Sequence, residues 1–283
     1  MENKVSIIES KFSLPDKEYS KTYFIEIRQA VKSKQELNEN TINIEVDKNF
    51  IKKDDFGYLF SIEVQKRTQS DTNGFRGMED FLSKLQQKII VYTDETGEIK
   101  SIVNHDEIKE LWVDSQKEFL NIYRNVKDIK NITKRINELL DSREDFLNLF
   151  EQSEIGTLLF PKIYFPDLRV HKQIFHQKFY RDFFGPFSLP LLIKTELLEE
   201  NNKKKHTRVF NEGIIDEQKF QEDAIKLFFR RLYTTYNLIV DFDIIYSELY
   251  DLNEKNVIDS VFQIFEVKVG EVYSFNQIVT VKS

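Results

Sequence analysis

The sequence predicts an α+β fold in which mainly antiparallel sheets, flat or curved, carry packed helices. Runs of alternating apolar and polar residues recur in both halves of the chain, and a middle segment repeats its apolar residues every 3.5 positions. A segment rich in proline and aromatic residues separates the halves. The predicted parts are an N-terminal β-rich part with a hairpin, a long helix or helical hairpin that belongs to the same half, a connection, and a C-terminal α+β part: 1–104, 105–152, 153–190 and 191–283.

The N-terminal part begins with three predicted strands. Their apolar residues alternate with polar ones, as in strands that bury one face: Tyr23, Ile25 and Ile27; Ile42, Ile44 and Val46; Phe60, Ile62 and Val64. Two short apolar runs at 89–92 and 99–103 then flank a turn that contains Gly97, and they predict a β-hairpin.

From Asn104 onward the period changes to that of a helix. Apolar and small residues stand alternately four and three positions apart: Ile108, Trp112, Ser115, Phe119, Ile122, Val126, Ile129, Thr133, Ile136 and Leu140. One continuous helix and a hairpin broken near 128–133 both fit this pattern. The repeated face is either a docking surface or part of the chain's own core.

The segment 153–190 interrupts these patterns, because it holds four of the five prolines. We expect a connection with a short helix around 171–183. Its aromatic and charged residues are of the types enriched at protein interfaces, which indicates a partner-binding surface: Phe179, Tyr180, Arg181, Phe183 and Phe184. A buried seam between the halves and a pocket for a hydrophobic ligand are the alternatives.

The C-terminal part predicts strands at 191–198, 203–210, 238–244, 261–269 and 273–281, with an amphipathic helix over 216–232. A basic cluster lies at the start of the second of these strands: Lys203, Lys204, Lys205 and Arg208. A solvated hairpin tip explains the cluster, and an acidic partner protein or a phosphate group would also suit it.

Composition excludes several classes of protein. The 283 residues carry 41 Lys and Arg against 48 Asp and Glu, a formal net charge of −7. A protein that coats nucleic acid needs a positive field, so nucleic acid is not an expected partner. The absence of cysteine excludes disulfides and thiol nucleophiles. The sequence contains no run typical of a signal peptide or a membrane span, so we expect a cytoplasmic protein.

No sequence motif indicates catalysis. The glycines form no phosphate-binding loop or dinucleotide fingerprint, and the four histidines lack the spacing of a helical metal pair. Asp241 and Asp243 share one face of a predicted strand, and alternation with the apolar residues indicates that this face is solvated. We therefore predict no catalytic residue, no metal ion and no cofactor.

The function that these observations favour is a non-enzymatic cytoplasmic module that binds another protein. An adaptor, a chaperone-like carrier, an immunity protein and a subunit of a larger assembly all fit that description. One alternative is a binder of an apolar small molecule in the cavity of a curved sheet. Another is an enzyme whose site is assembled only by folding.

Overall fold

A computed structural model describes the chain except for residues 1–11, 16, 35, 72–74, 202–205 and 234–238. The strands are β1 (Ser20–Ser33), β2 (Glu36–Asp54), β3 (Gly57–Gln69), β4 (Lys88–Thr93), β5 (Ile99–Ile102), β6 (Gln173–Phe184), β7 (Phe187–Asn201), β8 (His206–Ile215), β9 (Phe242–Asn253), β10 (Ile258–Val269) and β11 (Tyr273–Lys282). The helices are α1 (Phe75–Ser83), the short 3₁₀ helix Lys84–Gln86, α2 (His105–Ile122), α3 (Ile129–Asp141), α4 (Arg143–Glu151), α5 (Glu154–Leu159), α6 (Leu168–His171) and α7 (Glu222–Leu232).

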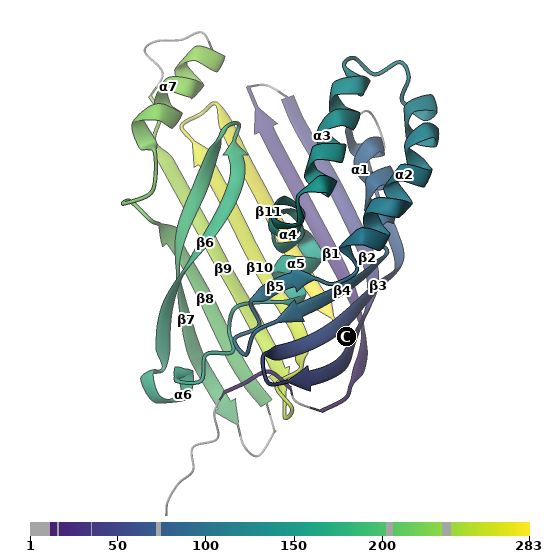
Figure 1. The fold of residues 1–283 in the computed structure, drawn as a ribbon. Coiled ribbons are helices and arrows are strands. Elements are labelled where there is room, and N and C mark those ends of the chain that lie inside the picture. The colour runs from purple at the N-terminus through teal and green to yellow at the C-terminus, as the bar shows by residue number, and fades with distance from the viewer. Residues whose placement is uncertain (1–11, 16, 35, 72–74, 202–205, 234–238) are drawn as a thin grey trace, which may run out of the picture.

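All eleven strands belong to one antiparallel sheet, which is not closed (Figure 1). Their order is β5-β4-β3-β2-β1-β11-β10-β9-β8-β7-β6. The chain therefore builds one half of the sheet outward from β1 and the other half inward from β6. The halves meet where β1 pairs with β11, from Phe24 opposite Lys282 to Ser33 opposite Tyr273.

The antiparallel sheet that alternation predicted is confirmed, although the strand predicted at 238–244 overlaps β9 only from Phe242 onward. The sheet is also larger than an α+β class implies. Strands hold 49% of the residues and helices 28%, so the fold is dominated by the sheet. In β1, for example, Tyr23, Ile25 and Ile27 are buried while Phe24 and Arg28 are exposed on the other face. The sheet curves around α4 and α5, and α2 and α3 stand on the same side (Figure 1).

The heptad-like segment is a helical hairpin of α2 and α3, with a break at residues 123–128. Trp112 and Phe119 are buried against the chain's own core, whereas Ile122 remains 53% exposed. The indole Nε1 of Trp112 donates a hydrogen bond to Asn137 Oδ1 of α3 at 2.7 Å. The face predicted from the heptads is thus largely internal.

The helix expected around 171–183 is wrong, because this segment is the strand β6. It alternates half-buried His176, Lys178 and Tyr180 with side chains that are exposed. The alternation ends at an irregularity of register between Tyr180 and Phe184, where Asp182 has a φ of 53°. The polar residues between the aromatics concealed a period of two.

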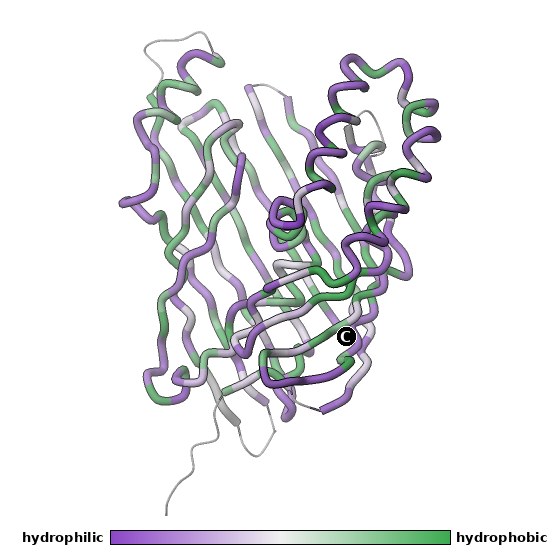
Figure 2. Tube along the Cα trace, viewed as in Figure 1, coloured by the Kyte–Doolittle hydropathy of each residue, from purple (hydrophilic) through white to green (hydrophobic). Residues whose placement is uncertain are grey.

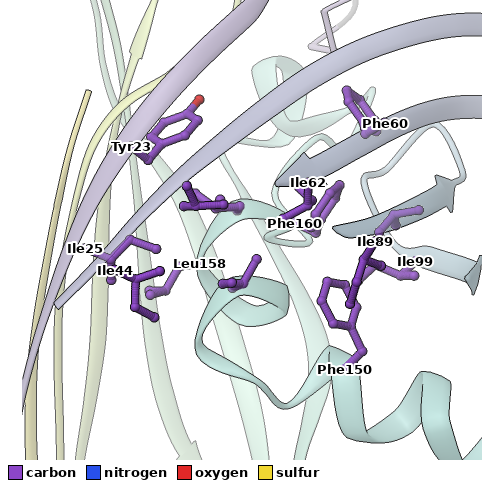
Figure 3. Packing of buried hydrophobic residues seen from close by; sticks show 14 of the residues in the cluster. Tyr23, Ile25, Ile44, Phe60, Ile62, Ile89, Ile99, Phe150, Leu158 and Phe160 are labelled. Atoms are coloured by element: carbon purple, nitrogen blue, oxygen red, sulfur yellow. The ribbon is translucent and has the colours of Figure 1, made fainter. Parts of the chain in front are cut away.

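Two hydrophobic clusters lie on the helix-bearing face of the sheet. The first cluster packs the hairpin and α4–α5 on the N-terminal half and includes Phe60, Trp112 and Phe150. Figure 3 shows Phe150, Leu158 and Phe160 facing the strand residues of this cluster. The second cluster lies under α7 and includes Phe229 and Phe265. Hydrophilic and hydrophobic residues follow each other along the strands of the sheet (Figure 2).

Candidate ligand-binding pocket

A pocket of about 690 Å³ lies between strand β6 and the segment α4–α5, on the curved face of the sheet. His176, Lys178 and Tyr180 of β6 form one wall, because the alternation of this strand turns all three to the same face. Glu151 and Thr157, at the end of α4 and in α5, form the opposite wall. The pocket therefore combines apolar, aromatic and charged groups.

A row of hydrogen-bonded polar side chains crosses seven strands below this pocket. We call Gln29, Gln277, Gln263, Glu248, Asn211, Thr195 and His176 the polar row. On one side of Glu248, three glutamines donate in turn: Gln29 Nε2 to Gln277 Oε1 (2.8 Å), Gln277 Nε2 to Gln263 Oε1 (2.9 Å) and Gln263 Nε2 to Glu248 Oε1 (2.9 Å). On the other side, Asn211 Nδ2 donates to Glu248 Oε2 (2.8 Å) and Thr195 Oγ1 donates to Asn211 Oδ1 (2.7 Å). The last bond joins His176 Nε2 and Thr195 Oγ1 (3.1 Å).

Strand register creates the row. Gln263 lies directly opposite Glu248, Glu248 opposite Asn211, and Asn211 opposite Thr195. Side chains directly opposite on one face of a sheet stand about 4.5–5.5 Å apart at Cβ, which is close enough for hydrogen bonds between them. One polar residue in each strand is therefore sufficient to build a continuous chain.

The polar row separates the two hydrophobic clusters. On β9, Tyr250 on one side of Glu248 belongs to the first cluster and Tyr246 on the other side belongs to the second. On β10, Val261 and Phe265 flank Gln263 in the same way. Apolar side chains at these positions would join the clusters and avoid the cost of burying polar groups. The stability of the fold therefore does not by itself explain why the polar row is present.

Two side chains that line the pocket, Lys178 and Glu248, form a buried ion pair. Lys178 Nζ lies 3.1 Å from Glu248 Oε1, and the Glu248 side chain is 3% exposed. Lys178 also donates to the hydroxyl of Tyr246, which in turn donates to Glu248. Burial alone would raise the pKa of Glu248, but Lys178 and the hydrogen bonds hold that pKa below its ordinary value. Burial would lower the pKa of Lys178, and Glu248 reverses the shift. Both groups are therefore charged and committed to each other.

His176 ends the polar row as a neutral imidazole. Burial, and then the charge of Lys178, lower its pKa from 6.5 to about 4. The hydroxyl proton of Thr195 goes to Asn211 Oδ1, so the hydroxyl oxygen is left to accept a hydrogen bond from His176 Nε2. Nδ1 is then the unprotonated nitrogen, and its buried lone pair has no partner among the described residues.

The remaining charges of the pocket lie nearer its mouth. Lys162 Nζ is 3.1 Å from Glu98 Oε1, so these two groups neutralise each other. Burial and the charge of Glu98 raise the pKa of Glu151 above its ordinary value. Arg181 is exposed, and its backbone N–H donates to Gln152 Oε1 at 2.9 Å. The lining thus holds three acidic side chains, Glu98, Glu151 and Glu248, and three basic ones, Lys162, Lys178 and Arg181, without a dominant sign.

The five residues predicted to bind a partner are divided by the structure. Tyr180 lines the pocket, Phe183 is half-buried, and Phe184 is buried in the second cluster. Phe179, which is 41% exposed, and Arg181, which is exposed, also border the pocket. Their role in partner binding stays a prediction.

The basic cluster is only partly visible, since Lys203, Lys204 and Lys205 lie outside the described residues. Arg208 is described, and its Nε donates to Asp251 Oδ1 at 2.8 Å. His206 Nε2 lies 3.3 Å from the same oxygen.

Sequence reasoning missed the central residues of the pocket. Glu248, Asn211, Thr195 and Gln263 are nearly fully buried, yet none stands in a recognisable motif. The available signal was a polar residue at a position of a strand where alternation requires an apolar one, as in Tyr246-Ser-Glu248-Leu-Tyr250.

The described part of the chain offers neither a metal site nor a membrane-spanning helix. No three or more of its His, Asp and Glu side chains are grouped so that they could hold a metal ion. None of its helices combines the length and the apolarity that crossing a membrane requires.

Comparison with known proteins gives no family, since no family model and no curated protein matches the chain. Three solved structures are similar to the chain, all with low TM-scores. A lipovitellin structure concerned with lipid–protein interactions has 9% identity and a TM-score of 0.42, and 95% of this chain covers 25% of that one. A DUF1329 family protein from Desulfovibrio piger has 9% identity and a TM-score of 0.22, over 93% and 85% of the two chains. A putative outer membrane lipoprotein-sorting protein domain from Vibrio parahaemolyticus has 6% identity and a TM-score of 0.15, over 92% and 82%.

These comparisons correct one prediction. The chain spans about a quarter of the lipovitellin chain, and its other neighbours include a domain named for outer membrane lipoprotein sorting. The cytoplasmic location expected from the sequence is contradicted by these neighbours and is withdrawn.

Proposed function

We propose that the protein reversibly binds a small molecule with an apolar body in the pocket between β6 and α4–α5. The observation that carries the proposal is the polar row, which forms the floor of a pocket between two hydrophobic clusters. Ligand pockets are commonly about 300–1,000 Å³ and carry fixed polar groups beside their apolar lining. A volume of about 690 Å³ lies within that range. Here Ile99, Phe160 and Ile193 supply apolar lining among a larger number of polar side chains.

A role in ligand binding explains the buried charges of Lys178 and Glu248 better than a role in packing does. An ion pair that is removed from water is often no more stabilising than well-packed apolar side chains of similar size. Lys178 and Glu248 nevertheless stand at the pocket beside Tyr180 and His176, where polar groups can fix the orientation of a ligand. The stiff sheet holds these groups in place before the ligand arrives, which reduces the ordering cost of binding.

The test fills the pocket without touching the polar row. Ser188 is half-buried and lines the pocket, and Ser101 is exposed on β5 at the other edge of the sheet. We expect Ser188→Trp to weaken binding of the neutral fluorescent probe N-phenyl-1-naphthylamine by about tenfold or more, equivalent to about 1.4 kcal/mol. The matched variant Ser101→Trp should bind as the wild type does.

Thermal melting of both variants separates pocket filling from unfolding. Native mass spectrometry of the purified protein should also show a released small molecule from the wild type and less of it from Ser188→Trp. Equal probe binding by all three proteins, or no binding by the wild type, would contradict the proposed function.

A further inference from the structure

A second, smaller cavity continues the pocket along the polar row. It has a volume of about 160 Å³ and is lined by Gln29, Gln263 and Gln277, three members of the row. Gln152 and Thr157 of the α4–α5 segment and Tyr180 of β6 line both cavities. The two spaces therefore adjoin beneath α5, and the row forms the floor of both.

We propose that the two cavities form one trough and that its ligand is an elongated, uncharged amphiphile that lies across the strands along the polar row. This inference rests on the proposed function and adds the shape and the charge of the ligand. Seven strands at about 4.8 Å from one to the next give the row a length of about 29 Å. A long flexible chain fits such a trough, whereas a compact molecule would fill only the larger cavity.

The walls of the trough suit an alkyl chain. Phe265, Phe275 and Phe183 line the smaller cavity on the side of the second cluster, and Leu158 and Val279 line it on the side of the first. Each apolar group that passes between these walls leaves water, which favours binding in proportion to the area buried. Affinity should therefore increase with chain length for as long as the trough continues.

The charges of the trough disfavour an ionic ligand. Lys178 is committed to Glu248 and Lys162 to Glu98, so neither lysine is available to an anion without breaking a pair. Glu151 and Glu154 add negative charge to the lining, and the exposed Arg181 adds positive charge at its mouth. A carboxylate head group would have to break one of these pairs or rely on the exposed Arg181, and an ammonium would have only Glu151 and Glu154. Either charge would also lose its hydration, which is costly in a low-dielectric site.

Neutral polar groups, in contrast, find partners along the floor. A glutamine side chain has two N–H donors and a carbonyl oxygen with two lone pairs. In Gln277 the row uses one N–H, toward Gln263, and one lone pair, toward Gln29. A hydroxyl or ester group of the ligand can use the second donor or the second lone pair. The half-buried Gln29 and Gln277 are exposed enough for such contacts.

The experiment measures displacement of N-phenyl-1-naphthylamine by alkanols, alkanoates and alkylamines of matched length. For the wild type we expect alkanol affinity to increase roughly threefold to fourfold per methylene as chains lengthen from about 8 to about 16 carbons. The alkanol should bind about tenfold or more tightly than the alkanoate or the amine of equal length.

Thr157→Phe tests the connection between the cavities. The half-buried Thr157 lines both of them, so a ring at this position should close the passage. We expect the longest alkanol to lose about tenfold in affinity and the shortest to change less than about twofold. The short alkanol is thus the control within the same variant, and thermal melting verifies that the variant is folded.

The outcomes are distinguishable. Displacement by none of the three series would contradict the proposed function itself. Alkanol binding with an unchanged dependence on length in Thr157→Phe would overturn the trough while leaving the pocket. Tighter binding of the alkanoate or the amine would overturn the uncharged ligand.

Discussion

Lys48 of β2 is a buried cation held by aromatic rings. Its side chain is 2% exposed, and its Nζ donates to the carbonyl oxygen of Leu159 at the end of α5. The ammonium nitrogen lies 4.1 Å from the ring centre of Phe160 and 4.7 Å from that of Phe60. Burial lowers the pKa of Lys48 from 10.5 to about 7, because the rings compensate only part of the lost hydration.

This residue should give the free energy of unfolding a dependence on pH. Between pH 7 and 10.5 the unfolded chain keeps the Lys48 proton while the folded chain has released it, so stability rises with pH in that window. We expect Lys48 to contribute a gain of about 2–3 kcal/mol from pH 7.5 to 9.5, taken as the difference between the wild type and Lys48→Met in urea unfolding at each pH. The difference is needed because burial raises the pKa of tyrosines such as Tyr19, which lowers the stability of both proteins as the pH approaches 10. Lys48→Met should flatten the curve, whereas Lys32→Met, at an exposed position of β1, should keep it. A wild-type curve that rises no more steeply than the Lys48→Met curve would contradict the assignment.

At the scale of single elements, the hairpin of α2 and α3 depends on Trp112. This side chain is 1% exposed, and its ring packs edge-on against Phe119 with 5.3 Å between centroids. Its hydrogen bond to Asn137 joins the two helices. Trp112 therefore links the two helices, and together with Phe119 and Ile108 it anchors the hairpin in the first cluster.

Trp112→Ala should cost about 3–5 kcal/mol of unfolding free energy, because it leaves a large cavity and removes the link to α3. Leu111 is the matched control, since its side chain is 52% exposed on the same helix and Leu111→Ala should cost less than about 0.5 kcal/mol. Urea unfolding followed by far-ultraviolet circular dichroism measures both variants. Equal costs for the two substitutions would show that the hairpin is not anchored by Trp112.

Local patterns predicted elements well where one face of the element is buried and the other is solvated. Strands β1 and β3 and helices α2 and α3 meet that condition, so their periods are visible in the sequence. Strand β6 does not, because Lys178 and His176 occupy its buried face and Phe179 its exposed face. Single members of the polar row break the alternation of their strands, but the continuous row could not be predicted, since it depends on the register of seven strands.

At the scale of the whole molecule, β11 joins the two halves of the sheet. It is the sixth of eleven strands in spatial order, although it is the last of them along the chain. Val279 and Val281 of this strand are each 1% exposed and belong to the first cluster, and Gln277 continues the polar row toward Gln29. Both the core and the proposed trough are therefore incomplete without it.

Ending the chain before Tyr273 should abolish the native fold, because β1 and β10 would both become unpaired edges that expose apolar surface. We expect the shortened protein to aggregate, measured by light scattering and size-exclusion chromatography. The matched control ends at Val281 and loses only Lys282 and Ser283, which are exposed. A shortened protein that stays monomeric and melts like the wild type would show that the halves are stable without β11.

The position of β11 also determines the order in which a nascent chain can fold. While the ribosome is still making β11, the strands of the first half have already been synthesised, and β1 remains an unpaired edge. Phe24 of β1 can pair with Lys282 of β11 only after Lys282 has been synthesised. The complete sheet can thus form only after translation of β11, and until then each half presents strand edges that chaperones recognise and that neighbouring nascent chains can join.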